Sequence, residues 1–174
     1  MALHILFVCT GNICRSPVAE RLAALYGTQI GVPDLQTSSA GVRAVIGHAV
    51  HPQAALVLEG LGGESADFAA RQLTAKIASQ ADLIITMTRE HRDAALGLAP
   101  RKLNRTFTLP EAAFLASEGG ARDVADLASL RPQFATHQLA DIPDPIGKPA
   151  EVFESVGNQI ASLLPPVLRL CRPD

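Results

Sequence analysis

Residues 5–17 read Ile5-Leu6-Phe7-Val8-Cys9-Thr10-Gly11-Asn12-Ile13-Cys14-Arg15-Ser16-Pro17, and this stretch decides how the rest of the chain is interpreted. Its first residues form an apolar run typical of a buried strand, and an amphipathic helix pattern follows its end. Gly11 permits a tight turn, while Pro17 suits the first helical position after a Ser16 cap. The stretch therefore predicts a strand, a short loop and a helix.

The loop between Cys9 and Arg15 has the composition of an anion site. The first N–H groups of a helix lack partners within the helix, and the macrodipole makes that end positive. The loop can curl around a tetrahedral oxyanion, and the Arg15 guanidinium can close the ring with a bidentate fork. We therefore expect six loop residues to hold a phosphate or sulfate group: Thr10, Gly11, Asn12, Ile13, Cys14 and Ser16.

Cys9 is the candidate nucleophile. An ordinary cysteine, with a pKa of about 8.5, is mostly protonated at neutral pH, and only the thiolate attacks efficiently. Loop amides, the helix end, Arg15 and a hydrogen bond from Ser16 would all favour the thiolate of Cys9. It would attack phosphorus in line and form a phosphocysteine. Because the amides and Arg15 neutralise the equatorial oxygens, this chemistry needs no metal and no other cofactor.

A cysteine followed six residues later by an arginine is, by itself, weak evidence for an anion loop. Cysteine is among the most buried residue types, so an inert core thiol is the ordinary expectation. The strand before Cys9, the turn at Gly11 and the proline after Ser16 supply the context that an anion loop requires. This context favours the anion loop.

Residues 8–17 resemble the signature Val-Cys-x-Gly-Asn-x-Cys-Arg-Ser-Pro of the low-molecular-weight protein tyrosine phosphatases, which is intact here. Four further stretches fit that family: Ser39-Ala40-Gly41, Ala70-Arg71-Gln72-Leu73, Asp82-Leu83-Ile84-Ile85-Thr86-Met87 and Asp144-Pro145. The resemblance implies that Cys9 is the nucleophile, that Arg15 binds phosphate and assists its transfer, and that Asp144 is the proton donor. It also implies that the Asn12 amide braces the loop, with a simple turn asparagine as the alternative.

Cys14 has two interpretations. The resemblance implies that it forms a reversible disulfide with Cys9, which would protect the nucleophile from overoxidation. Alternatively, Cys14 packs beneath the loop and has no redox role. Three cysteines do not make a disulfide scaffold, and Cys171 near the end of the chain is expected to be structural or incidental.

The chemistry independently requires an acid such as Asp144. A phenolate leaving group must be protonated as its bond to phosphorus breaks, and the same carboxylate can then take a proton from water. Residues 140–147 contain two prolines and a glycine, which fix a short loop that can hold one carboxylate over the anion site. The family pattern selects Asp144, and Asp141 is expected to be exposed or to brace the loop.

Length and composition indicate one domain spanning residues 1–174. The chain is 48% hydrophobic, which suffices for a substantial core, and its formal charge is −2. Basic residues are spread along the chain, so no block argues for nucleic acid or an anionic membrane. Apolar runs are interrupted before they reach membrane-spanning length, and the first is too short for a secretory signal. We expect a cytoplasmic protein whose oligomeric state the sequence does not reveal.

Strand and helix patterns alternate along the chain, which predicts an α/β fold with a parallel sheet. Strands are expected at residues 3–8, 35–39, 82–87 and 105–109, and helices at 17–26, 52–61, 74–80 and 89–98. A doubly wound sheet would place its ligand beyond the carboxyl ends of the strands, where Cys9 lies. The family implies four strands with a crossover, flanked by helices on both faces.

Three further expectations concern breaks and insertions. Gly27 should end the first helix, and Pro165-Pro166 should interrupt a last helix that begins near Pro149. Segment 110–140 exceeds the equivalent family connection and can contain short helices at 112–116 and 124–130. It could shape the pocket rim, although a plain surface excursion is the usual explanation for such an insertion.

The substrate class follows from departures from the family pattern. Ile146 stands where many tyrosine-directed members carry an aromatic residue, and the stretch 41–47 is also aliphatic, so stacking is replaced by apolar contact. Related phosphoarginine phosphatases tend to carry threonine at the position where this chain has the aliphatic Ile13. This difference favours a phosphorylated protein carrying phosphotyrosine as the substrate. Phosphoarginine remains the alternative.

Two other functions use the same residues. An arsenate reductase linked to thioredoxin needs a resolving cysteine pair in mid-chain, and none lies between Cys14 and Cys171, although a version resolved by a small thiol remains open. A non-catalytic phosphoresidue-binding module would need neither Cys9 nor Asp144. The histidines lack the spacing of a zinc site, so we assign none of them a metal or a catalytic role.

Overall fold

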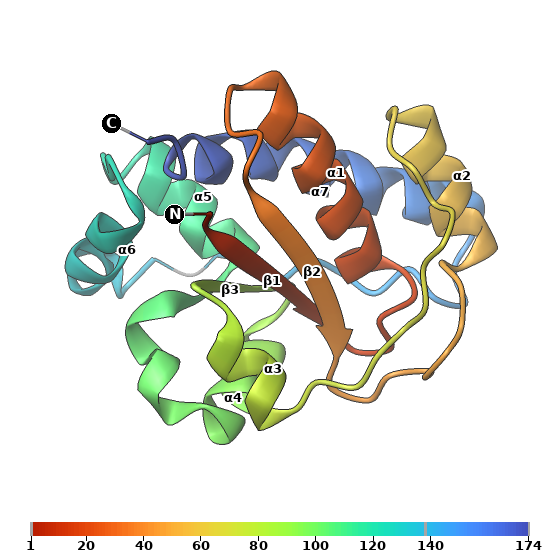
Figure 1. Ribbon diagram of the computed structural model, residues 1–174, viewed down its shortest axis with the longest axis horizontal. Coiled ribbons are helices and arrows are strands. Elements are labelled where there is room, and N and C mark those ends of the chain that lie inside the picture. Colours follow the sequence, from red (N-terminus) through yellow and green to blue (C-terminus); the bar gives the residue numbers. More distant parts are fainter. Residues whose placement is uncertain (1, 138, 174) are drawn as a thin grey trace.

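The computed structural model describes residues 2–137 and 139–173. Its centre is one parallel sheet with the strand order β2-β1-β3-β4 (Figure 1). The strands are β1 (His4–Cys9), β2 (Gln36–Gly41), β3 (Leu83–Thr86) and β4 (Thr106–Thr108). The predicted α/β class and the four-stranded parallel arrangement are confirmed.

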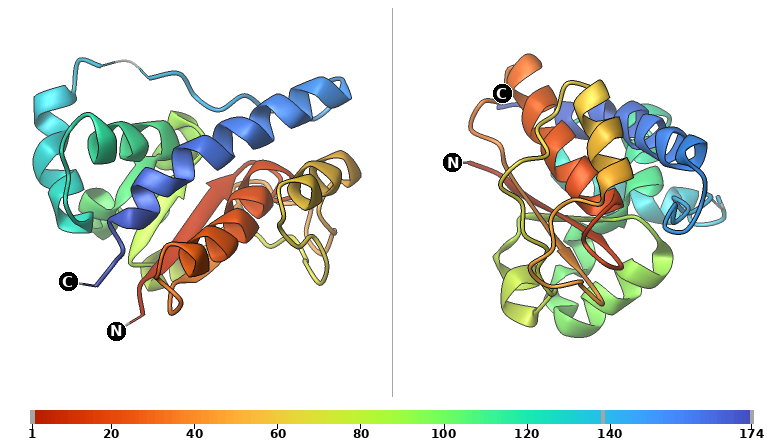
Figure 2. Two further views of the ribbon diagram at one scale, coloured as in Figure 1. Left: turned by 90° about the horizontal axis from the view of Figure 1, so that it is seen from above. Right: turned by 90° about the vertical axis from the view of Figure 1, so that its right-hand side faces the viewer.

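Helices cover both faces of the sheet (Figure 1). One face carries α1 (Arg15–Gln29), α2 (Pro52–Gly60), α5 (Leu109–Ser117), α6 (Val124–Leu130) and α7 (Ala150–Arg169). The other carries α3 (Ala75–Gln80) and α4 (Arg89–Leu98), and the short 3-10 helices are η1 (Pro100–Arg105) and η2 (Arg131–Phe134). Figure 2 shows α1 and α7 side by side over the sheet. The doubly wound layering is therefore confirmed.

The central strand β1 is buried on both faces. Ile5 and Phe7 join the core under α1 and α7, whereas Leu6 and Val8 join the smaller core under α3 and α4. A strand covered on both sides needs a continuous apolar run, which explains the sequence before Cys9. From β1 the chain pairs β2 on one side and β3 on the other, so the sheet's topological switch point lies at Cys9.

Helix α1 differs from its predicted bounds at both ends. It begins at Arg15, so Ser16 lies inside the first turn and is not the cap, because its hydroxyl contacts the Cys9 thiol instead. It also continues through Gly27 to Gln29. A Cβ at Gly27 would lie 3.0 Å from Leu35 Cδ2, so this glycine permits close packing, and Gly31, with φ of +88°, follows the helix end.

Helix α7 passes through Pro165 and Pro166 without a break, so the predicted interruption is wrong. Proline removes one N–H from the helix ladder and crowds the preceding turn. The flanking residues Leu164, Val167 and Leu168 are fully buried against the sheet and neighbouring helices. Tertiary packing therefore holds a helix that the local sequence disfavours.

Segment 110–140 is not a surface excursion. It contains most of α5, together with α6 and η2, and its Leu115 and Leu127 are buried in the main core. The helices predicted at 112–116 and 124–130 are present, the first as the longer α5. The other predicted strands and helices are also present, with small shifts at their ends.

A glycine substitution tests the packing of α7 on α2. In Gly157→Ala the new Cβ would clash with Val57 Cγ1, so we expect a loss of about 1–3 kcal/mol in the free energy of unfolding. In the matched variant Gly97→Ala the added Cβ meets nothing within 4 Å, so helix propensity should stabilise the protein by about 0.5–1 kcal/mol. Urea unfolding measures both, and equal stabilisation of the two variants would contradict the packing.

Candidate active site

The loop from Thr10 to Cys14 turns its carbonyl groups outward. Thr10 O, Gly11 O and Ile13 O accept hydrogen bonds from the backbone N–H groups of Arg43, Val45 and His51 at 2.9, 2.9 and 2.7 Å. With these carbonyls bound on the outside, the loop's own N–H groups are left for the inside of the turn. Successive amides that face a concavity can form an anion site, and the sequence-based assignment of these residues to such a site stays a prediction.

The Cys9 thiol lies at the base of this loop. Its Sγ is 2.8 Å from Ser16 Oγ, in the first turn of α1. Helix α1 begins after Cys14, and no side-chain hydrogen bond caps it. The thiol therefore lies beside the amino terminus of α1, where backbone N–H groups lack partners within the helix.

Asn12 makes the bracing contacts that the sequence analysis expected. Its Nδ2 donates to Ser16 Oγ at 2.8 Å and to Ser39 Oγ at 2.9 Å, while Oδ1 accepts from Arg71 N at 2.9 Å. Asn12 is fully buried, and its φ of 57° lies in the left-handed region that asparagine tolerates. These contacts fix the loop from behind, on the side opposite the anion.

The close approach of the anion loop to the end of β2 requires a glycine at position 41. A Cβ at this position would clash with Thr10 O and lie 3.0 Å from Asn12 N. The loop can therefore lie against the end of β2 only because Gly41 has no side chain.

Arg15 connects the anion loop with the segment that carries the acid. Its guanidinium donates to Ile142 O at 2.8 Å and to Thr10 Oγ1 at 3.4 Å, and it lies 3.6 Å from Asp144 Oδ2. The Arg15 side chain is only 4% exposed, so its orientation is fixed by the protein rather than by solvent. One guanidinium thus spans both halves of the site.

The acid segment is anchored at its start and open at its tip. Ile142 N donates to Met87 O at 3.0 Å, and Asp141 Oδ1 accepts from Arg89 N at 3.0 Å. Asp141 therefore braces the segment, in agreement with one of its two expected roles. Asp144 is 50% exposed and accepts from Ile146 N at 3.1 Å, so its carboxyl can exchange protons with water.

A cavity of about 240 Å³ brings these parts together. Its lining includes the predicted residues Cys9, Thr10, Gly11, Ile13, Cys14, Arg15, Asp144 and Ile146. Asn12 and Ser16, predicted as substrate-binding, do not line the cavity and act from behind the loop. Val45 lines it and belongs to the stretch 41–47 that the sequence predicted as an aliphatic wall, whereas the charged Arg43 of the same stretch lines it without having been singled out, since a single arginine in an irregular segment carries no signal. Among residues 110–137 and 139–140, none lines the cavity, so the suggestion that this segment shapes the pocket rim is wrong for its described part.

Sequence reasoning also missed His91, which is buried on α4. Its Nε2 lies 2.8 Å from Thr10 Oγ1, the hydroxyl that Arg15 also contacts. Burial, together with the positive charge of Arg15, lowers the pKa of His91 to about 4. A neutral histidine therefore supports the loop, and only its position at the start of a helix was visible in the sequence.

Cys14 is a buried thiol beneath the loop, and it is free, as are Cys9 and Cys171. Burial, followed by the charge of Cys9, raises the pKa of Cys14 to about 12. Cys14 is therefore protonated at neutral pH and is a poor nucleophile compared with an anion-site thiolate. The Cys9–Cys14 disulfide stays a prediction.

Within residues 2–137 and 139–173, no group of three or more His, Cys, Asp or Glu side chains could hold a metal ion. Across the same residues, no helix combines the length and the apolar character that a membrane crossing requires. His51, one of the histidines without an assigned role, caps α2 by accepting from Gln53 N at 3.2 Å and stacks on Phe153.

The fold and the anion loop define a phosphate-handling α/β protein built around a cysteine and an arginine. Residues 4–130 match the family model of the low molecular weight phosphotyrosine protein phosphatases, and the chain belongs to this family of cysteine-based hydrolases. The family predicted from residues 8–17 is therefore confirmed.

Similar proteins of this family are named for two different phosphorylated residues, arginine and tyrosine. A protein-arginine-phosphatase of Geobacillus stearothermophilus is 32% identical over 94% of this chain and 93% of its own. The low molecular weight protein-tyrosine-phosphatase Wzb of Salmonella typhi is 40% identical over 59% of this chain and 66% of its own. The solved YwlE arginine phosphatase with a phosphorylated active-site serine has a TM-score of 0.76 and 25% identity, covering 96% of this chain and 94% of its own.

The buried His91 predicts a component of acid sensitivity. Its folded pKa of about 4 lies below the ordinary 6.5, so the unfolded chain binds more protons between these values. The contribution of neutral His91 to the free energy of unfolding is therefore fully present above about pH 6.5 and is lost as the pH falls toward about 4. Arg15 and Arg43 also lower this pKa, whereas Asp141 and Asp144 raise it.

In His91→Gln we expect a smaller loss of stability over this pH range than in the unmodified protein, measured by urea unfolding. The matched variant His48→Gln removes an exposed histidine and should keep the original slope. Parallel pH dependence of the unmodified protein and His91→Gln would show that His91 does not titrate in this way.

Proposed function

We propose that this enzyme hydrolyses phosphomonoesters through a covalent bond between Cys9 and phosphorus. The observation that carries the proposal is one cavity lined by Cys9, Arg15 and Asp144, with the last two 3.6 Å apart. Inward amides and the guanidinium can hold three phosphate oxygens while the sulfur attacks the phosphorus opposite the ester oxygen. A solved relative, the YwlE arginine phosphatase in a mutant with serine in place of cysteine, carries phosphate on that active-site serine, which supports covalent attack by a side chain at this kind of site.

The reaction consists of two displacements at phosphorus, one that forms the bond to Cys9 and one that breaks it. In the first, the Cys9 thiolate forms a bond to phosphorus, the ester bond breaks, and Asp144 gives its proton to the departing oxygen. In the second, the Asp144 carboxylate takes a proton from water, the water oxygen bonds to phosphorus, and Cys9 leaves as a thiolate. The exposed Asp144 and the buried Arg15 suit these roles, because one exchanges protons and the other stays charged.

Phosphotyrosine in proteins is the proposed substrate. Val45 and Ile146 line the mouth of the cavity and are 39% and 41% exposed, so they offer aliphatic walls to a phenyl ring. Ile13 adds a third aliphatic side chain to the lining. Apolar walls suit a neutral ring better than the cationic guanidinium of phosphoarginine. The similar arginine phosphatase keeps phosphoarginine as the second candidate.

The other functions fit the cavity less well. Arsenate reduction by a resolving pair lacks cysteines between Cys14 and Cys171, and a small-thiol route would leave Asp144 without a task. A binding module would have no use for a thiol paired with Ser16. We further propose that the whole chain, residues 1–174, acts as one catalytic domain in the cytoplasm, where thiols stay reduced. Its loop would also bind free phosphate or sulfate.

Two substitutions test the assigned roles with an aryl phosphate. Cys9→Ser should abolish turnover, whereas Cys171→Ser, which changes a half-buried thiol at the opposite end of the fold, should retain it. Asp144→Asn should lower kcat by about 10²–10⁴-fold, most strongly for poor leaving groups, and Asp141→Asn should lower it less. Steady-state kinetics measure the rates, and rapid quenching should trap phosphate on Cys9. Equal turnover in all variants would exclude these roles.

A substrate panel tests the preference. We expect kcat/KM for a phosphotyrosine peptide to exceed that for the same peptide with phosphoarginine by about tenfold or more, because apolar pockets discriminate by a few kcal/mol at most. Arsenate with a small thiol should show no reduction. Faster hydrolysis of the phosphoarginine peptide would assign the arginine activity and reject the phosphotyrosine preference.

A further inference from the structure

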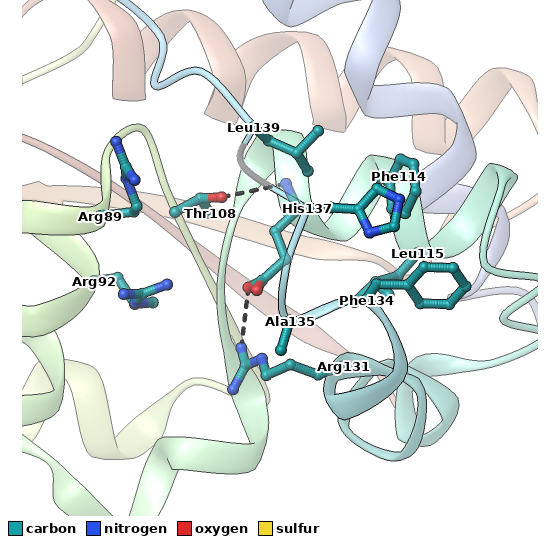
Figure 3. Close-up of a pocket in the computed structure, with 11 residues that line it drawn as sticks. Arg89, Arg92, Thr108, Phe114, Leu115, Arg131, Phe134, Ala135, His137 and Leu139 are labelled. Atoms are coloured by element: carbon teal, nitrogen blue, oxygen red, sulfur yellow. Dashed lines mark hydrogen bonds and ion pairs between the residues drawn. The ribbon is translucent and has the colours of Figure 1, made fainter.

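A second cavity of about 280 Å³ shares no lining residue with the Cys9 cavity. It lies between α4, the start of α5, η2, and the residues Ala135, His137 and Leu139 that follow η2 (Figure 3). Five of its lining residues lie beyond residue 130, where the match to the family model ends: Arg131, Phe134, Ala135, His137 and Leu139. This chain therefore builds the cavity partly from sequence outside the matched region.

Three guanidinium groups line this cavity. Arg89 and Arg92 come from neighbouring turns of α4, and Arg131 comes from η2. Each lies near one carboxylate: Arg89 Nε is 3.4 Å from Asp141, Arg92 is 3.2 Å from Asp93, and Arg131 is 3.1 Å from Glu111. Only Glu111 of these acids lines the cavity. Because a guanidinium has five N–H donors, one carboxylate does not saturate Arg89 or Arg92.

Arg131 is held in place before any ligand arrives. Its guanidinium lies 3.9 Å from the centre of the Phe107 ring and donates to Leu103 O at 3.1 Å and to Thr106 O. Its Nε is buried and has no hydrogen-bond acceptor among the described residues. A buried donor without a partner is unfavourable, and a preorganised arginine loses little entropy when it binds an anion.

The opposite side of the cavity is aromatic. Figure 3 shows the rings of Phe114, Phe134 and His137 gathered away from Arg89 and Arg92. Phe114 lies 5.3 Å from Phe134 and 5.1 Å from His137, measured between ring centres. Leu115 and Leu139 complete this apolar side. A ligand that satisfies both sides needs a flat ring at one end and an anionic group at the other.

We propose that this cavity is a second binding site, which takes a small aromatic ring bearing an oxyanion, either carboxylate or phosphate. The ring lies against Phe114, Phe134 and His137, and the oxyanion faces Arg89, Arg92 and Arg131. Two sources share this chemistry: a free aromatic acid, and the side chain of a phosphotyrosine residue other than the one at Cys9. Binding at this site does not require the reaction proposed at Cys9.

Nuclear magnetic resonance titration with naphthalene-2-carboxylate tests the site directly. Orthovanadate first fills the Cys9 loop, so that binding there does not interfere. We expect saturable shifts centred on residues 131–137 and on Arg92, with a Kd on the order of 1 mM for a probe of this size. Acetate, which lacks the ring, should bind at least about tenfold more weakly.

Matched variants separate the cavity from general surface charge. Arg92→Gln and Phe134→Leu should each weaken binding by about fivefold, since one charged hydrogen bond or ring contact contributes about 1 kcal/mol. Arg101→Gln removes an equal charge from the exposed surface outside the cavity and should leave the Kd unchanged. Shifts that do not saturate, shifts centred on residues 10–16, or equal weakening by Arg92→Gln and Arg101→Gln would overturn the proposal.

A titration with benzylphosphonate, which mimics the phosphotyrosine side chain, distinguishes the two sources. Saturable shifts at residues 131–137 with this probe would support a phosphotyrosine side chain as the ligand. Binding of the carboxylate alone would support a free aromatic acid. If neither probe shifts these residues while both unmodified protein and vanadate complex remain folded, the cavity is not such a site.

Discussion

The outward hydrogen bonding of the loop carbonyls between Cys9 and Arg15 is the constraint on which the site depends. A turn directs its N–H groups inward only if its carbonyls find partners elsewhere, and here the segment 43–51 supplies them. Asn12 holds the same loop from behind through Ser16 and Ser39. The anion site is thus made by bonds on the outer surface of the loop.

Arg15 extends this constraint to the acid. A loop that only bound phosphate could use any cation, but Arg15 also donates to Ile142 O and lies beside Asp144. Its rigid fork therefore sets how far the acid segment stands from the phosphate position, which a flexible lysine would not do. Since Ile142 also donates to Met87 at the end of β3, two strands and one helix determine the position of a single carboxylate.

Local patterns predicted the site well because its parts are adjacent in sequence. Cys9, Asn12 and Arg15 lie within one strand-loop-helix unit, and the buried run of β1 fixes their direction. His91 and Arg43 reach the site only through tertiary contacts, so no local pattern could reveal them. The errors at Gly27 and Pro165 have the same origin: propensity indicated helix ends there, but packing against Leu35 and the burial of Leu164 and Val167 outweighed it.

The burial of segment 110–140 shows how this chain can vary without disturbing its chemistry. Helix α5 packs its Leu115 into the main core, yet none of its residues reaches the cavity of Cys9. The segment instead lines the second cavity together with Arg89 and Arg92 of α4, and its Arg131 stacks on Phe107 of β4. Helix α4 also carries His91, which contacts Thr10 of the anion loop. A change in the lining beyond residue 130 can therefore alter the second cavity while the bonds that orient Cys9 and Arg15 stay as they are.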